Sequence, residues 1–271
     1  MEQLEKHALN IRKNILLEVH AANSGHPGGS LSAVEILVSL YFKEMNLSKE
    51  NIDSPDRDKF VLSKGHASPL LYAVLAEKGI LDQKELTSFR KINSKLQGHP
   101  NMNLVKGVEM STGSLGQGLS ASVGMALSAR IKNIHSRVYT LLGDGELEEG
   151  MIWEAAMSAA HYKLDNLLAI VDNNNLQIDG PITEVMSPYP IFDKFKAFGW
   201  HVIKVDGHNY DELFKAYAEA KKIKEKPTCI IAHTIKGKGI SFMENQVGWH
   251  GKAPNDEQFK LAMDELERGI Q

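Results

Sequence analysis

Cysteine is almost missing from this 271-residue sequence, which contains only Cys229. One cysteine excludes a disulfide within the chain and fits a reducing compartment such as the cytoplasm, and its apolar neighbours favour a core position. The net charge is only -3, so neither nucleic acid nor a membrane surface is indicated as a partner. No run approaches the roughly 20 apolar residues of a membrane span. The charged N-terminus lacks a signal peptide's apolar core. We therefore expect a cytoplasmic protein.

Linkers and internal repeats are also missing, so we expect one domain over residues 1–271. Short apolar runs alternate with segments of helical periodicity, which predicts a three-layer α/β/α fold with a central, mainly parallel sheet. The expected strands are 59–62, 138–142, 166–172, 200–205 and 228–233. The expected helices are an N-terminal one with Leu4, Ala8, Ile11, Ile15 and Val19 on one side, then 32–42, 69–78, 82–90, 115–132, 149–163, 210–224 and 256–268.

Four further segments are expected to lack regular structure: a glycine-rich turn at 23–30, an irregular stretch at 96–113, and loops at 178–190 and 236–254. Long loops inside a compact domain tend to be functional. The sequence Lys236-Gly-Lys-Gly239 fits either a mobile lid or a basic surface loop. The sequence alone leaves that choice open.

The most informative pattern is Gly143-Asp-Gly145 followed, after a predicted helix and strand, by Asn173-Asn174. Each polar group follows a buried strand, so both should reach the crevice at the carboxyl edge of the sheet. The Asp144 carboxylate, the Asn174 amide oxygen and a carbonyl near Leu176 suit Mg²⁺ or Ca²⁺. Glycine permits close approach of a phosphate, and the helix beginning near Glu149 would point its N-terminus at that anion. A bound metal diphosphate is predicted.

Four histidines stand in loops marked by glycine or proline: His26, His66, His99 and His250. A loop histidine taken alone is usually solvated. Zinc would require closely spaced ligand pairs, which this set lacks. We expect the four imidazoles to surround a polar, phosphorylated substrate. The glycine-rich run Ser111–Gly118 is by itself only a weak phosphate signal.

Together, these motifs resemble the N-terminal half of transketolase, in that family's order and over nearly the whole chain. The resemblance rests on Ser24-Gly-His-Pro-Gly28, Leu62-Ser-Lys-Gly-His-Ala-Ser-Pro69, Gly98-His-Pro100, Thr112-Gly-Ser-Leu-Gly-Gln-Gly118, Gly143-Asp-Gly-Glu-Leu-Glu-Glu-Gly150, Asp172-Asn-Asn-Asn-Leu-Gln-Ile-Asp-Gly180 and Trp249-His-Gly-Lys-Ala-Pro254. It implies a thiamine-diphosphate fold, and an enzyme that transfers a two-carbon ketol unit from a ketose phosphate to an aldose phosphate in the pentose phosphate pathway.

The resemblance also implies roles for single residues. Asp144, Asn174 and the Leu176 carbonyl would bind Mg²⁺, with Ca²⁺ or Mn²⁺ as alternatives. The residues implied to contact thiamine diphosphate are His66, Gly113, Ser114, Leu115, Asp144, Gly145, Glu146, Glu149, Asn174, Ile178 and His250. Within that set Glu149 would belong to an acidic network that links paired cofactor sites. The four histidines would surround the sugar, and His26 and His99 best match positions that handle substrate hydroxyls and protons.

A complete transketolase is more than twice as long as this sequence. The family's pyrimidine-binding domain, with its cofactor-activating glutamate, its phosphate-binding arginines and the terminal domain, has no counterpart here. The resemblance therefore implies a partner, a C-terminal transketolase subunit, most simply in an α2β2 assembly. The alternatives are a specialised sugar transketolase, half of another thiamine enzyme such as deoxyxylulose-phosphate synthase or a 2-oxo-acid dehydrogenase, and a non-catalytic thiamine-diphosphate-binding module.

Overall fold

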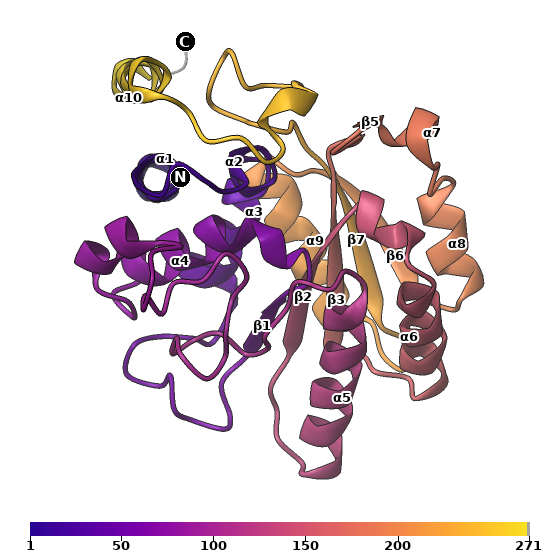
Figure 1. Ribbon diagram of the computed structural model, residues 1–271. Helices are drawn as coiled ribbons and strands as arrows, with labels where there is room; N and C mark the ends of the chain where they lie inside the picture. Colours follow the sequence, from indigo (N-terminus) through magenta and orange to yellow (C-terminus); the bar gives the residue numbers. More distant parts are fainter. Residues whose placement is uncertain (270–271) are drawn as a thin grey trace.

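The computed structural model describes residues 1–269 and shows a five-stranded sheet between layers of helices (Figure 1). The strands of this sheet are β1 (Lys59–Leu62), β2 (Val138–Gly143), β3 (Leu167–Asn173), β6 (His201–Asp206) and β7 (Thr228–His233). The longer helices are α1 (Glu2–Ala21), α4 (Ser68–Glu77), α5 (Gln117–Ile131), α6 (Gly150–His161), α9 (Tyr210–Lys222) and α10 (Asp256–Arg268). These elements confirm the predicted three-layer α/β/α class.

All neighbouring strands of this sheet run parallel, in the order β1-β2-β3-β7-β6. In the central register Leu141 lies opposite Ile170, which in turn lies opposite Ile230. Parallel strands buried on both faces read as continuous apolar runs rather than as alternating ones. That is why the five strands could be recognised in the sequence to within about one or two residues at each end.

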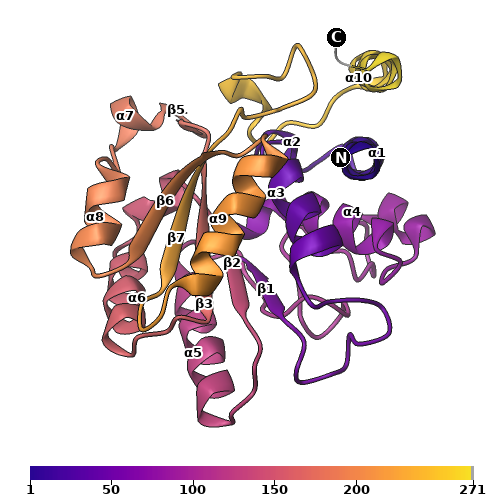
Figure 2. The same ribbon diagram turned by 180° about the vertical axis from the view of Figure 1, so that it is seen from behind.

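The two faces of the sheet carry separate apolar clusters. Alternate residues of β3 point to opposite sides: Leu168 and Ile170 belong to one cluster, and Ala169 and Val171 to the other. Helices α5, α6 and α8 (Ile191–Ala197) cover the second face, whereas α9 and α3 (Val34–Ser39) cover the first (Figures 1 and 2). Cys229 is fully buried on the second face, as predicted.

Helix α1 lies outside this sandwich and packs against α4 and α10, beside both chain ends (Figure 1). Its predicted apolar side is buried. Helix α10 begins with a capping box in which the Asn255 side chain accepts from the Gln258 N–H. Within residues 1–269 no helix is both long and apolar enough to cross a membrane.

Two predicted elements are wrong in their extent. The glycine-rich turn at 23–30 includes a short helix, α2 (Pro27–Leu31), because Pro27 is well suited to a first helical turn. The single helix expected at 32–42 is interrupted by the non-helical backbone of Ala33, so that α3 begins at Val34 and ends in a π-helical turn, Leu40–Glu44. The expected helix at 82–90 is only a 3₁₀ segment, Gln83–Ser88.

The loop expected at 178–190 is also more ordered than predicted. Strands β4 (Leu176–Gln177) and β5 (Gly180–Pro181) form a small antiparallel hairpin, followed by one helical turn, α7 (Ile182–Val185). Helix α8 was not predicted, because seven residues are too few for a clear helical period. Residues 96–113 have no helix or strand, as expected, and 236–254 contains only a 3₁₀ turn, Val247–Trp249.

Candidate active site

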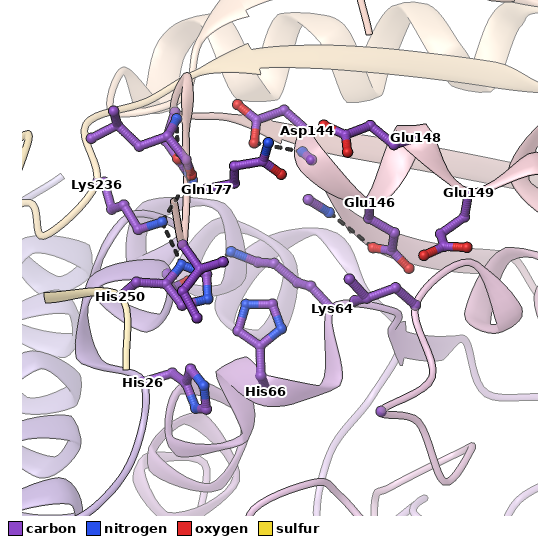
Figure 3. Close-up of a pocket in the computed structure, with 18 residues that line it drawn as sticks. His26, Lys64, His66, Asp144, Glu146, Glu148, Glu149, Gln177, Lys236 and His250 are labelled. Carbon is purple, nitrogen blue, oxygen red and sulfur yellow. Dashed lines mark hydrogen bonds between the residues drawn. The ribbon is translucent and has the colours of Figure 1, made fainter. Parts of the chain in front are cut away.

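A cavity of about 390 Å³ opens at the carboxyl ends of β1, β2, β3 and β7 (Figure 3). The topology explains its position, since loops that follow parallel strands meet at one edge of a sheet. In Figure 3 the histidines and Lys236 lie on one side, and Glu146, Glu148 and Glu149 lie on the other. The cavity is lined by His26, Gly29, Lys64, His66, Gly113, Leu115, Gly143, Asp144, Gly145, Glu146, Glu148, Glu149, Asn174, Leu176, Gln177, Ile178, Lys236 and His250.

Most of the predicted site residues lie on this wall, although they come from segments far apart in the chain. The exceptions are Ser114, which is exposed nearby, and His99. The His99 ring packs against Gly113, where an added Cβ would approach it within 2.9 Å. Gly113 also has a φ of +152°, so only glycine suits this position. The four histidines therefore do not all line one cavity, because His99 lies behind its wall.

Three imidazoles form a cluster on the cavity wall. The ring centres of His26 and His66 are 5.1 Å apart, and the His250 ring lies 5.5 and 5.3 Å from them. Burial, then the charge of Arg90, lowers the pKa of His26 to about 4, and burial with Lys236 lowers the pKa of His250 to about 3. Burial, then Lys64, also lowers the pKa of His66 well below its usual value. Near pH 7 all three rings are neutral.

The lowered pKa of His26 predicts how stability depends on pH. As pH falls from about 6.5 towards 4, the unfolded chain binds a proton that folded His26 does not, so folding free energy is lost in this window. We expect His26→Asn to reduce the drop in Tm between pH 7 and pH 5, and exposed His135→Asn to leave the drop unchanged. Thermal scans of the cofactor-free chain measure both, and an equal drop in all three proteins would refute this account of His26.

Asp144 occupies the position expected from its place after β2. Its carboxylate accepts hydrogen bonds from the Gly145 and Asn175 N–H groups at 2.9 and 2.6 Å, and from the Asn173 amide at 3.1 Å. The side chain is 2% exposed. Burial, then the nearby Asp172 carboxylate, raises the pKa of Asp144 to about 6. A carboxylate held in this way is suited to a cation.

The other two predicted metal ligands lie beside it. Asn174 is buried, its amide donates to Asp172 at 3.0 Å, and its Oδ1 accepts from the Leu176 N–H at 3.2 Å. The Leu176 carbonyl lines the same cavity and accepts from the Lys236 ammonium at 2.8 Å. Residues 1–269 contain no cluster of three or more histidine, cysteine or acidic side chains for a metal. A set of one carboxylate, one amide and one carbonyl is of a different kind and suits a hard cation.

Lys64 is a site residue that we did not predict. Its ammonium bonds the Asp172 carboxylate at 2.5 Å and the Gly29 carbonyl at 2.6 Å, and it is 2% exposed. Asp172 also accepts from Ser32 at 2.5 Å and from Thr234. Although burial opposes ionisation, the Lys64 charge and these donors hold the pKa of Asp172 below its usual value. The pair links the loop after β1 to the end of β3.

Lys236 is the second residue that sequence reasoning missed. It belongs neither to a lid nor to a surface loop, since its side chain is 2% exposed and its ammonium lies 2.8 Å from both the Leu176 carbonyl and His250 Nδ1. Burial is the main cause that lowers its pKa, to about 8. A signal for both lysines was available, because Lys64 and Lys236 follow strands at the edge where Asp144 and Asn174 were placed.

Glu146 joins three loops around the cavity. Its carboxylate accepts from Ser63 at 2.5 Å and from the N–H groups of Gly116 and Gly143 at 2.8 and 3.0 Å. All three bonds belong to the protein, so Glu146 holds the cavity wall together. Glu149, at the start of α6, is exposed and lines the cavity rim, as does Ile178, which is 61% exposed.

The lining fits a diphosphate that carries a divalent cation. Two buried ammonium groups, Lys64 and Lys236, offer positive charge to an anion, while Asp144 offers a carboxylate to a cation. The side-chain nitrogens His26 Nδ1 and Gln177 Nε2 are buried and have no hydrogen-bond partner within residues 1–269. Such donors are normally satisfied in a folded protein. A polar ligand in the cavity would complete the set.

Comparisons with known proteins agree with this chemistry. Residues 5–267 match the family described as transketolase, thiamine diphosphate binding domain. The 6-deoxy-6-sulfo-D-fructose transketolase subunit SqwG from Clostridium sp. (strain MSTE9) is 46% identical, with 98% of this chain and 96% of that protein aligned. One of the two subunits of an apulose-4-phosphate transketolase from Phocaeicola vulgatus is 40% identical, with 100% and 96% aligned.

Longer transketolases match over their corresponding part only. Human transketolase is 48% identical over 93% of this chain, which spans 40% of the human protein. The crystal structure of transketolase from Campylobacter jejuni superimposes with a TM-score of 0.93 at 36% identity and covers 98% of this chain and 43% of that one. The chain therefore belongs to the transketolase family of transferases and corresponds to its N-terminal, thiamine-diphosphate-binding part.

Proposed function

We propose that this chain supplies the diphosphate-binding side of a cytoplasmic transketolase of the pentose phosphate pathway. It would act as a single domain with a separate C-terminal subunit, most simply as α2β2. The reaction would be transfer of a two-carbon ketol unit from a ketose phosphate to an aldose phosphate. The observation that carries the proposal is the single cavity in which Asp144, Asn174 and the Leu176 carbonyl face two buried lysines and three neutral histidines.

The residues would divide the cofactor among them. Asp144, Asn174 and the Leu176 carbonyl would bind the divalent metal, Mg²⁺ or alternatively Ca²⁺ or Mn²⁺. The diphosphate would be held by His66, Gly145 and His250, to which the structure adds Lys64 and Lys236; Gly113, Ser114, Leu115 and Ile178 would contact the rings, and Glu149 would join the acidic network between sites. Bound thiamine diphosphate supplies the carbanion chemistry. The chain's own residues bind and orient it.

His26 is the group of this chain best suited to move a substrate proton. Its neutral ring has an Nδ1 atom without a hydrogen-bond partner within residues 1–269, and the imidazoles of His66 and His250 surround it. A neutral imidazole can accept a proton from a sugar hydroxyl, and general acid–base help of this kind contributes roughly 100- to 10,000-fold. His99, behind Gly113, would act at the outer end of the same sugar. The partner subunit would supply the activating glutamate.

A second candidate is a specialised sugar transketolase. It is favoured by the two subunit-length relatives, which are named for 6-deoxy-6-sulfo-D-fructose and for apulose 4-phosphate. In this reading the cofactor side stays the same, and the partner selects the sugar. Assays with these two substrates next to common ketose phosphates distinguish the candidates.

Cofactor binding tests the proposal without any sugar. Calorimetry on the chain mixed with its C-terminal subunit should show thiamine diphosphate binding that requires Mg²⁺ and is abolished by EDTA. Thiamine without its diphosphate is the control and should bind far more weakly, because the buried lysines recognise the anion. Equal binding of thiamine and thiamine diphosphate, or no effect of EDTA, would contradict the proposed division of the site.

A further inference from the structure

Two hydrogen bonds hold the backbone on either side of Lys236. The Ile235 N–H donates to His208 Nε2 at 2.9 Å, and Arg12 Nε donates to the Lys238 carbonyl at 3.0 Å. The Lys236 side chain, between these two points, enters the cavity (Figure 3). A long side chain that is almost fully buried loses much rotamer freedom, so a fixed backbone reduces the cost of placing its ammonium.

The two anchoring side chains are joined by a buried carboxylate. Glu35 on α3 accepts from Arg12 Nη2 at 2.6 Å and from His208 Nδ1 at 2.8 Å. Arg12 and Glu35 are 7% and 6% exposed. Although burial alone would raise it, Arg12 and His208 hold the pKa of Glu35 at about 2. The Arg12–Glu35–His208 cluster is therefore a charged group inside the protein, outside the cavity itself.

The bonding pattern fixes the protonation of His208. A backbone N–H can only donate, so Nε2 of His208 must be an acceptor when it meets Ile235. The single ring proton then lies on Nδ1, where it is donated to Glu35. One imidazole thus links the carboxylate of α3 to the chain that carries Lys236.

The same chain segment approaches the cluster too closely for a side chain. Gly239 has a φ of +97°, and a Cβ added there would lie 2.6 Å from Arg12 Nε. The Gly237 N–H donates to the Gly28 carbonyl at 3.0 Å, beside the histidine loop. The glycines of Lys236-Gly-Lys-Gly239 therefore allow close packing against the cluster.

We propose that His208, supported by Arg12 and Glu35, is a positioning residue that holds Lys236 in the cofactor cavity. The inference rests on the proposed cofactor site for its functional consequence, but not for its structural one. His208 touches neither the cavity nor the predicted ligands; it acts through the backbone of residues 235–238.

Two substitutions separate the bonds of His208. In His208→Asn the amide nitrogen takes the place of Nδ1 and can still donate to Glu35, but nothing replaces the acceptor Nε2. In His208→Gln the amide oxygen can reach the place of Nε2 and accept from Ile235. His201→Asn, on the surface of β6, is the matched control. We expect His208→Asn to speed amide hydrogen exchange in residues 235–239 about tenfold, and His208→Gln to restore slow exchange.

Lys236 itself gives a second readout. In trace labelling with acetic anhydride, buried Lys236 should react slowly relative to exposed Lys222, and faster in His208→Asn. Acceleration spread equally over α1, α3 and β7, or no change at 235–239 and Lys236, would overturn the proposal. With Mg²⁺ and the C-terminal subunit, the Kd for thiamine diphosphate should rise at least about tenfold in His208→Asn. If the unchanged chain binds no cofactor, the proposed function fails while the labelling result still decides the role of His208.

Discussion

Replacing Asp144 by Ala is expected to reduce ketol transfer by about 1000-fold or more, equivalent to roughly 4 kcal/mol of transition-state stabilisation. The physical reason is that the proposed metal site has one carboxylate, and its other ligands, Asn174 and the Leu176 carbonyl, are uncharged. Neutral oxygens alone hold a divalent cation weakly. The measurement is kcat/KM of the assembled enzyme, together with its metal content after gel filtration.

The matched control is Asp193→Ala, which removes an exposed carboxylate on α8. It should leave both activity and metal content unchanged. In the Asp144→Ala protein, partner binding should persist while metal, cofactor and turnover are lost together. A variant that kept its cofactor and its activity would contradict the metal assignment and would favour a binding or scaffold role for this chain.

Replacing Lys64 by Met should cause the largest loss of stability. Asp172 is 0% exposed, and without the ammonium its charge would be buried and uncompensated. Breaking a buried pair in this way costs about 3–5 kcal/mol. At the size of this domain that corresponds to a Tm lower by roughly 10 °C. Thermal unfolding of the cofactor-free chain measures the effect.

The sequence contains a suitable control, the exposed pair Lys106–Asp53, whose charged atoms are also 2.5 Å apart. Lys106→Met should cost no more than about 1 kcal/mol, because water screens the exposed partner. Combining Lys64→Met with Asp172→Asn should recover most of the lost stability, since no charge is then left buried. Equal losses for Lys64→Met and Lys106→Met would show that burial does not decide the strength of this pair.

The residues that sequence reasoning identified correctly follow from one rule. Strands β2 and β3 are apolar throughout, so Asp144 and Asn174 stand out as the polar groups after each strand. Parallel topology then brings them to one crevice. Three of the four loop histidines were placed together for a similar reason, since each flanks an element that ends at that edge.

What could not be predicted depends on distances across the fold. Nothing local marks Lys64 as the partner of Asp172, because they are 108 positions apart in the chain. The burial of Lys236 likewise depends on the approach of Leu176 and His250 from other loops. His99 lies behind Gly113 because of a backbone conformation that the sequence does not display. Short elements such as α8 and the β4–β5 hairpin offer too few residues for a periodic pattern.

The central claim is that this chain contributes the diphosphate-binding side of a two-subunit transketolase. The most direct test is ketol transfer from xylulose 5-phosphate to ribose 5-phosphate with Mg²⁺ and thiamine diphosphate. The chain is assayed alone, and again with the C-terminal subunit encoded by the adjacent reading frame. We predict activity in the mixture and none in the chain alone. Full activity of the isolated chain would contradict the claim, because the activating glutamate would then have to come from within it.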